Sequence, residues 1–146
     1  MFIQNEGAIS WRAIRQPTVA TSTTEAEYMA LYTAAQEAIW LQRLYQELKI
    51  VKDEAILINQ DNQGCIALSK NEMCQQRTKH IDIKFHFVRE SVLMKKIFLK
   101  YVESNNMVAD ILTKNLPVKM FEIQRERMGV KTNDMQKIMS RESVKE

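Results

Sequence analysis

The chain has 146 residues, enough for one domain, and its 45% hydrophobic content can supply a core. Charged residues make up 27% and the net charge is +3, both ordinary for a soluble protein. No apolar run approaches the roughly 18 residues of a membrane span, and residues 1–6 lack the basic and apolar regions of a secretory signal. We therefore expect an intracellular protein, cytoplasmic or nuclear, that is neither secreted nor inserted into a membrane.

The two cysteines, Cys65 and Cys74, are too few and too irregularly spaced for a zinc site. In a reducing compartment a disulfide is disfavoured, so we expect two free thiols.

The first predicted elements are a strand over residues 7–14, where apolar and polar side chains alternate, and a long helix from Ser22 to about Lys49. Ser22 and Glu25 have the spacing of a capping box, which marks a helix start. Apolar side chains then recur with the period of a helix and predict one buried face: Tyr28, Leu31, Ala35, Ala38, Leu41, Leu44 and Leu48.

After a polar turn over residues 51–54, residues 55–60 read as a buried strand that places Asp61 at its carboxyl end. A short helix over residues 62–69 and a loop over 70–76 follow. The next helix, residues 77–94, turns four apolar side chains inward: Ile81, Phe85, Val88 and Val92.

Residues 97–102 predict another strand, and residues 104–106 cap a helix over 107–114. Pro117 begins a helix that Gly129 ends after Met128, and the charged tail of residues 131–146 is expected to be loose. Because strands alternate with helices, the pattern indicates an α/β domain in which the two later strands pair in parallel.

Basic residues gather between Arg77 and Lys100, where seven basic and two acidic residues give +5, which leaves −2 for the rest of the chain. His80, Phe85, His86 and Phe87 lie among them. Such a segment can follow a phosphate backbone, or it can be a solvated helix face.

Three carboxylates are candidate metal ligands, and each has a simpler alternative. Asp61 lies where ligands bind in open α/β sheets, but it can also cap the next helix. Glu27 can form a capping pair with Thr24, and Asp110 can pair with Lys114 one turn later. Together the three can converge to hold Mg²⁺, which takes few carboxylates and several waters.

Six blocks of the sequence stand out together: Ile9-Ser10-Trp11, Ser22-Thr23-Thr24-Glu25-Ala26-Glu27-Tyr28, Asp61-Asn62-Gln63-Gly64-Cys65, Arg77-Thr78-Lys79-His80-Ile81-Asp82, Asn106-Met107-Val108-Ala109-Asp110 and Leu116-Pro117. In this order they resemble the ribonuclease H region of Copia-type LTR retrotransposon Pol polyproteins, over about residues 8–130.

The resemblance implies a ribonuclease H-like fold and hydrolysis of the RNA strand of RNA/DNA hybrids by a water that two Mg²⁺ ions activate. By position, the residues that resemble the metal-binding and catalytic carboxylates are Glu27, Asp61 and Asp110. The helix from residue 77 would contact nucleic acid through Arg77, Lys79, His80, Lys84 and Arg89. We expect His80 and His86 to pack or contact phosphate rather than to take part in catalysis.

The first metal-binding aspartate of the family has no counterpart in this sequence. In the family it lies upstream of the segment that matches Met1. The resemblance thus implies an incomplete domain over residues 1–130 that lacks the first strand and most of the second, so the strand at residues 7–14 would have no neighbour. We expect weak or absent Mg²⁺ binding and an inactive chain when it is alone.

Two alternatives to the enzyme are a host-adopted nucleic-acid-binding module and a protein-interaction module without catalysis. The expected partners are an RNA/DNA hybrid or other nucleic acid and, within a longer polyprotein, the upstream reverse transcriptase segment. Self-association through an open sheet edge is a further expectation.

Overall fold

The structure is a computed structural model that describes residues 1–50, 54–71 and 79–131. The chain divides into two compact units, one comprising Arg15–Met107 and the other Met1–Ile14 together with Val108–Glu146. Each unit is described by itself. The polar turn, the loop and the tail predicted at 51–54, 70–76 and 131–146 fall largely outside the described residues.

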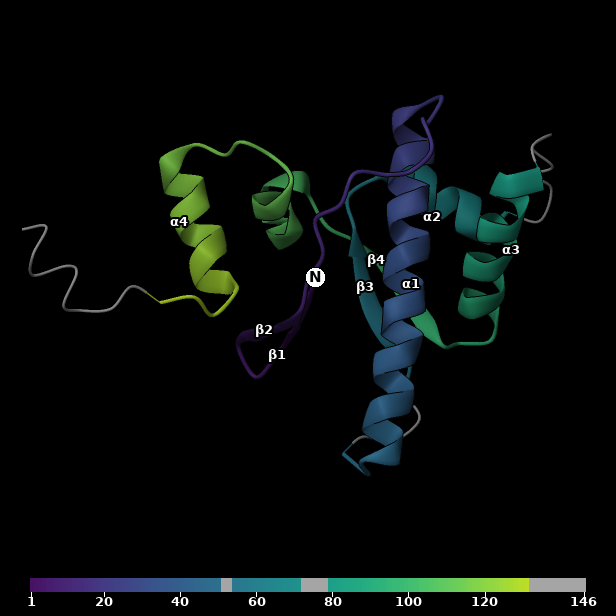
Figure 1. Cartoon of the computed structure of the whole chain (residues 1–146), viewed down its shortest axis with the longest axis horizontal. Helices are drawn as coiled ribbons and strands as arrows, with labels where there is room; N and C mark the ends of the chain where they lie inside the picture. Colours follow the sequence, from purple (N-terminus) through teal and green to yellow (C-terminus); the bar gives the residue numbers. More distant parts are fainter. Residues whose placement is uncertain (51–53, 72–78, 132–146) are drawn as a thin grey trace, which may run out of the picture. The chain divides into compact units, whose positions relative to one another are not determined.

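The larger unit carries the predicted helices and the parallel strands (Figure 1). Its strands pair in parallel, with Ile56 opposite Ile97 and Gln60 opposite Tyr101, as predicted. Its elements in chain order are α1 (Thr23–Glu47), β3 (Ile56–Gln60), α2 (Gln63–Lys70), α3 (Lys79–Leu93), β4 (Ile97–Tyr101) and the short 3-10 helix η1 (Ser104–Asn106).

The core of this unit lies between the helices and one face of the β3–β4 pair. Ile58 and Leu99 face inward as register partners, whereas Leu57 and Phe98 leave the opposite face exposed. The apolar face predicted on α1 is buried at Tyr28, Leu31, Ala35, Ala38 and Leu41.

The buried part of this apolar face ends before the end of the helix. Leu48, predicted to be buried, is the C-cap of α1 and is 58% exposed, so that prediction is wrong. The inward positions expected on α3 are confirmed for Phe85 and Val88. Val92 is only half-buried, and the side chain of Ile81 lies outside the description.

The start of α1 is held by a variant of the predicted capping box. The Glu25 amide donates to the Ser22 hydroxyl at 3.1 Å, as expected for an N-cap. The Glu25 carboxylate reaches one residue further back and accepts hydrogen bonds from the amide and the hydroxyl of Thr21. These bonds, together with the nearby charge of Lys84, lower the pKa of Glu25.

Helices α1 and α3 end in the same way, with a lysine in a left-handed conformation. Lys49 (φ 57°) donates to the Gln46 carbonyl while Ile50 donates to Tyr45. At the end of α3, Lys95 (φ 55°) and Lys96 repeat this pattern toward Val92 and Ser91. Both are Schellman motifs, although glycine is the usual residue at the left-handed position.

The smaller unit contains a hairpin that corrects two predictions. Strand β2 is Gly7–Ser10 rather than residues 7–14, and it is not unpaired, because β1 (Phe2–Gln4) pairs with it antiparallel. Asn5 and Glu6 both have positive φ and form the two-residue turn. Since β1 has only three residues, the strand stops where its partner ends, and Trp11 and Ile14 are exposed.

The rest of this unit is η2 (Val108–Leu112) and α4 (Val118–Arg127). The α-helix predicted over residues 107–114 is wrong, because Met107 is extended between two 3-10 turns. Helix α4 agrees with its prediction, with Pro117 as N-cap and Gly129 in a left-handed conformation after its end.

Hydrogen bonding joins the hairpin to the end of α4. The Ala8 amide donates to the Met128 carbonyl at 2.9 Å, and a Cβ on Gly129 would meet the Glu6 carbonyl oxygen at 2.2 Å. None of the helices in the described ranges is long and apolar enough to cross a bilayer.

Candidate metal and nucleic-acid site

Asp61 follows β3 directly and is positioned by a residue that follows β4. The Ser104 hydroxyl donates to its Oδ2 at 3.0 Å. The alternative role of Asp61 as a helix cap is wrong, since the N-cap of α2 is Asn62, whose side chain accepts from the Cys65 amide at 3.0 Å. The Asp61 carboxylate therefore does not serve as the cap of α2.

Cys65 lies in the first turn of α2 and is fully buried against the start of α1. Its thiol donates to the Thr24 carbonyl at a Sγ–O distance of 3.3 Å. Burial, the largest cause, and the negative charges of Glu27 and Asp61 together raise the pKa of this thiol to about 12. The charges of two carboxylates that are far apart in the sequence thus raise the pKa of one thiol.

Gly64 allows this close approach of α1 and α2. A Cβ at this position would lie 3.0 Å from Asn62 Oδ1 and 3.2 Å from Thr24 Cγ2. A side chain at this position would crowd Asn62, the N-cap of α2, and Thr24 in the first turn of α1.

Chemically, the arrangement offers oxygen ligands rather than sulfur. At neutral pH the Cys65 thiol keeps its proton, so it is a poor metal ligand. Glu27 and Asp61 are half-buried carboxylates, and Mg²⁺ binds through one or two such groups while it keeps several waters. The donor set therefore fits a hard divalent cation. The capping pair of Glu27 with Thr24 stays a prediction.

Asp110 belongs to the smaller unit, where it lies in η2. Its Oδ2 is 2.8 Å from Lys114 Nζ, so the predicted pairing one turn later is confirmed. Within the described ranges no three His, Cys, Asp or Glu side chains are close enough to hold one ion together. The set of three metal carboxylates stays a prediction, and of the three only Glu27 and Asp61 belong to the larger unit.

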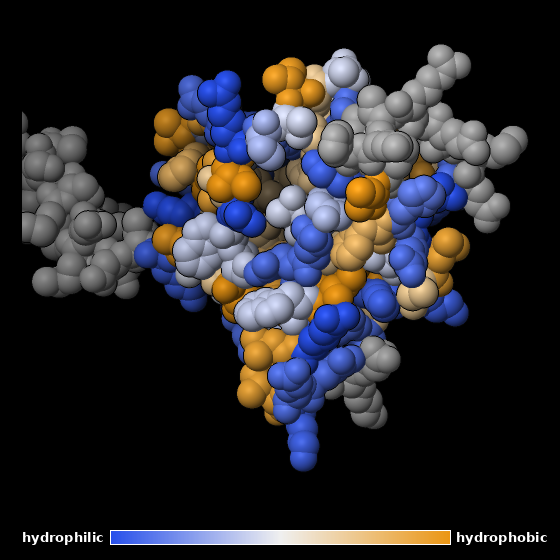
Figure 2. All heavy atoms as spheres, turned by 45° about the vertical axis from the view of Figure 1, so that its right-hand side comes forward, coloured by the Kyte–Doolittle hydropathy of each residue, from blue (hydrophilic) through white to orange (hydrophobic). Residues whose placement is uncertain are grey.

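The basic helix α3 contributes Lys84 and Arg89, which are both half-buried. Lys84 Nζ lies 5.9 Å from the centroid of the Tyr32 ring, a cation–π geometry, and its charge acts on Glu25. On the face drawn in Figure 2, hydrophilic residues are spread among hydrophobic ones rather than gathered in one block.

The other predicted nucleic-acid contacts are less fully described. Arg77 lies outside the described residues, and Lys79 and His80 open α3 with side chains that lie outside the description. Helix α3 is nevertheless fixed against α1, because the Phe85 and Tyr28 rings stack with centroids 4.0 Å apart. The α3 side chains thus have a rigid support.

Sequence reasoning missed two residues that position the site. Ser104 was assigned only to a helix cap. Nothing in the sequence pattern indicates that its hydroxyl, which follows β4, bonds to Asp61, which follows the neighbouring strand β3. Cys65 was treated as an ordinary free thiol. Asn62, by contrast, could be predicted as the N-cap of α2. Asparagine is a frequent N-cap, and its side chain accepts a hydrogen bond from the amide three residues later, here that of Cys65.

Comparison with known proteins shows similar sequences in several transposons. Over 133 residues, 91% of the chain, it is 42% identical to the retrovirus-related Pol polyprotein from transposon TNT 1-94 of Nicotiana tabacum. It is 34% identical over 122 residues to the Pol polyprotein of transposon RE1 of Arabidopsis thaliana, and 30% identical over 126 residues to the Ty1-NL2 Gag-Pol polyprotein of Saccharomyces cerevisiae. Its homologues are retrotransposon Pol polyproteins.

The similarity to Pol polyproteins covers most of this chain but little of those proteins. The chain spans 10%, 8% and 7% of the tobacco, Arabidopsis and yeast polyproteins, respectively. No family model matches the chain, and no solved structure matches it. The comparisons confirm only the coarser part of the expectation, that the homologues of this chain are retrotransposon Pol polyproteins.

Proposed function

We propose that the chain is the ribonuclease H segment of a Copia-type retrotransposon Pol polyprotein, with a ribonuclease H-like fold. The activity of that segment would be hydrolysis of the RNA strand of RNA/DNA hybrids. The observation that carries the proposal is the position of Asp61, which directly follows β3 and accepts a hydrogen bond from Ser104 beyond β4. This is the end of a parallel sheet where α/β proteins bind ligands. Glu27 supports the proposal, because its charge and that of Asp61 both act on the buried Cys65 thiol.

In this proposal Glu27, Asp61 and Asp110 are the carboxylates that hold Mg²⁺. These residues would hold the ions, which would supply activation of a water and stabilisation of the leaving oxygen of an in-line displacement. Within the larger unit, Glu27 and Asp61 supply negative charge, and Ser104 fixes the orientation of the Asp61 carboxylate. The protonated Cys65 thiol supports the site by joining the starts of α1 and α2.

The basic residues of α3 would contact phosphates of the hybrid, and the contacts should weaken with salt. Lys84 supports this role because its charge already acts on Glu25, two residues before Glu27. Lys84, one of the proposed phosphate contacts, therefore lies near the end of α1 that carries Glu27.

The 146 residues alone are expected to bind Mg²⁺ weakly and to cleave little. The resemblance implies four metal carboxylates, whereas the chain offers three candidates, one of them ion-paired with Lys114. Fewer carboxylates give weaker Mg²⁺ binding, because the bound ion then has less compensating charge.

A second candidate function, a protein-interaction module, is favoured by the outer face of the β3–β4 pair. Leu57 and Phe98 are register partners there and are 50% and 61% exposed. Adjacent exposed apolar side chains on a sheet are typical of docking surfaces. In a polyprotein the upstream reverse transcriptase segment would be the partner.

The experiment compares RNA/DNA hybrid, double-stranded DNA and double-stranded RNA as ligands and substrates of the purified chain. We expect salt-dependent, hybrid-preferring binding that the double variant Lys84→Glu with Arg89→Glu weakens at least tenfold. Lys119→Glu with Lys70→Glu is the charge-matched control, because both lysines are exposed and lie outside the basic segment 77–100.

Cleavage is followed in the same samples with Mg²⁺ and with Asp61→Asn. Cleavage that the variant abolishes would support the ribonuclease assignment and overturn the expected inactivity. Equal affinity for all three duplexes, with no cleavage, would contradict the ribonuclease assignment. Binding of the reverse transcriptase segment, lost in Phe98→Lys, would then favour the interaction module.

A further inference from the structure

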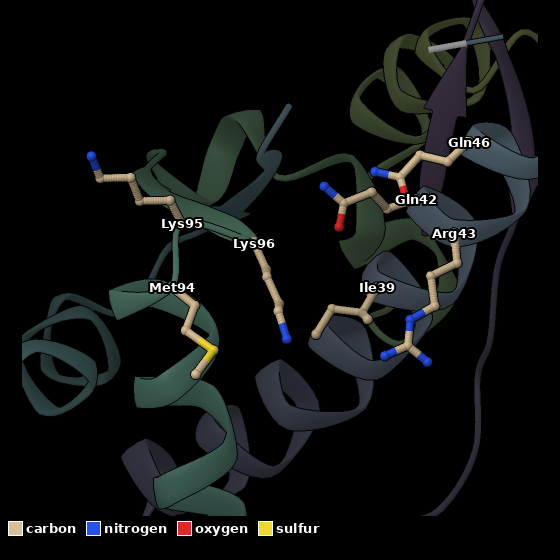
Figure 3. A pocket seen from close by; sticks show the side chains of 7 residues that line it. All are labelled: Ile39, Gln42, Arg43, Gln46, Met94, Lys95 and Lys96. Carbon is tan, nitrogen blue, oxygen red and sulfur yellow. The ribbon is translucent and has the colours of Figure 1, made fainter. Parts of the chain in front are cut away.

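A cavity of about 320 Å³ lies between the second half of α1 and the connection from α3 to β4 (Figure 3). Two apolar side chains, Ile39 and Met94, form part of its wall. Its other lining residues are Gln42, Arg43, Gln46, Lys95 and Lys96. The volume is at the lower end of the range of small-molecule pockets.

The cavity is far from the carboxylate pair. Lys96 directly precedes β4, whereas Asp61 directly follows β3, and the two strands run parallel in register. The sites therefore lie at opposite ends of a strand pair of five residues, which is roughly 16 Å long. A ligand in this cavity is independent of the proposed metal site.

The lining is positively charged. It contains Arg43, Lys95 and Lys96 and no acidic residue. In the part of the chain that the structure describes, no carboxylate forms an ion pair with any of the three. An unneutralised cluster of this kind attracts anions.

The ends of α1 and α3 beside the cavity offset this charge only in part. Each helix C-terminus is equivalent to about half a negative charge, so two ends contribute about one against three cations. The Schellman bonds of Lys95 and Lys96 also occupy the carbonyls of Val92 and Ser91. The cavity therefore keeps a net positive charge, which an anionic phosphate monoester complements.

The walls are held in place from several sides. The Gln42 amide nitrogen donates to the Glu54 carbonyl at 2.7 Å, and Gln42 is buried. Lys96 follows the fixed end of α3, and in Figure 3 its side chain extends toward Ile39 of α1, whereas Lys95 points away from the cavity. Arg43 and Lys96 are thus the cations placed to contact a ligand.

We propose that this cavity binds the phosphate group of a small phosphate ester of nucleotide size. The Arg43 guanidinium and the Lys96 ammonium hold the phosphate, since both donate charge-assisted hydrogen bonds to phosphate oxygens. Ile39 and Met94 contact the apolar part of the ester. The phosphate comes either from a free mononucleotide or from the end of a nucleic acid strand.

The test is an NMR titration of the ¹⁵N-labelled full chain with adenosine 5′-monophosphate, adenosine, inorganic phosphate and a 5′-phosphorylated trinucleotide. We expect saturable shifts at the amides of residues 39–46 and 94–96, with a dissociation constant on the order of 1 mM or below for the monophosphate. Inorganic phosphate should bind more weakly. Tighter binding of the trinucleotide identifies a strand end as the source, and tighter binding of the monophosphate identifies the free nucleotide.

Arg43→Gln and Lys96→Gln should each weaken binding about tenfold, the effect of losing one charge-assisted hydrogen bond. Lys100→Gln is the matched control, because it removes the same charge from an exposed position of β4 outside the cavity. The proposal is overturned if no saturable shifts occur, if adenosine binds as well as its monophosphate, or if the control variant weakens binding equally.

Discussion

The Cys65 thiol donates a hydrogen bond to the Thr24 carbonyl at 3.3 Å and thereby joins the start of α2 to the start of α1. This contact explains how two carboxylates that are 34 positions apart in the sequence, Glu27 and Asp61, act on one group. The thiol holds the elements that carry them, while its own proton stays bound at neutral pH.

The first prediction concerns the reactivity of this thiol. In a Cys74→Ser background Cys65 is the only thiol, and its pKa of about 12 leaves almost no thiolate at pH 8. Modification by a disulfide reagent should therefore be at least a hundredfold slower in the folded chain than in urea. Equal rates in the two states would show that Cys65 is not buried as described.

The second prediction is the alkaline stability that follows from the same shift. The unfolded thiol loses its proton near pH 9.0, whereas the folded thiol keeps it to about pH 12, so stability falls as pH rises above 9.0. Urea unfolding at pH 8.0 and 10.5 should show a larger loss for the native chain than for Cys65→Ala. A loss of the same size in both would contradict the shift.

The third prediction is for acid stability at the start of α1. The pKa of Glu25 is lowered in the folded state, so its contribution is present above the unfolded value of 4.5 and is lost as pH falls. Glu25→Gln should flatten the stability profile on the acid side, because it removes the titrating group. Ser22→Ala should cost about 1 kcal/mol at every pH, since it removes an uncharged cap.

The fourth prediction compares two glycines of the smaller unit. Gly129 has φ +81°, and a Cβ there would lie 2.2 Å from the Glu6 carbonyl oxygen, so Gly129→Ala should destabilise the hairpin contact by at least about 2 kcal/mol. Gly7→Ala is the control, because the nearest atom would be 3.8 Å away. Amide exchange at Ala8 reports the difference, and similar protection in both variants would refute it.

The fifth prediction is that glycine suits the end of α1 better than the lysine present. Lys49 has φ 57°, so Lys49→Gly relieves left-handed strain and should stabilise the chain by up to about 1 kcal/mol. Glu47→Gly, in the last helical position, should instead destabilise it by about 1 kcal/mol. Thermal unfolding separates the two, and destabilisation by both variants would count against the strain.

The sequence predicted the elements whose signals are local. The cap at Ser22, the apolar period along α1 and the buried strand before Asp61 all depend on neighbours within a few residues, and each is present. The 3-10 turns at 104–112 could not be distinguished from a helix, because a short apolar period suits both.

Errors arose where partners distant in sequence decide the outcome. Leu48 lies on the predicted apolar face, but nothing in the pattern shows that packing stops before it. The extent of β2 is set by its three-residue partner β1, which was not predicted. The candidate carboxylates were found because their positions at element ends are readable, whereas Ser104 and Cys65 position the site through contacts that only the fold defines.

The most direct test of the account is Mn²⁺ titration of the ¹⁵N-labelled chain, followed by paramagnetic broadening of amide signals. A metal site built on Glu27 and Asp61 should give broadening centred on residues 24–27 and 61–65, reversed by excess Mg²⁺ and lost in Asp61→Asn. Glu54→Gln, an exposed carboxylate before β3, should leave it unchanged. Broadening that is absent, or that persists unchanged in Asp61→Asn, would contradict a metal site built on Glu27 and Asp61.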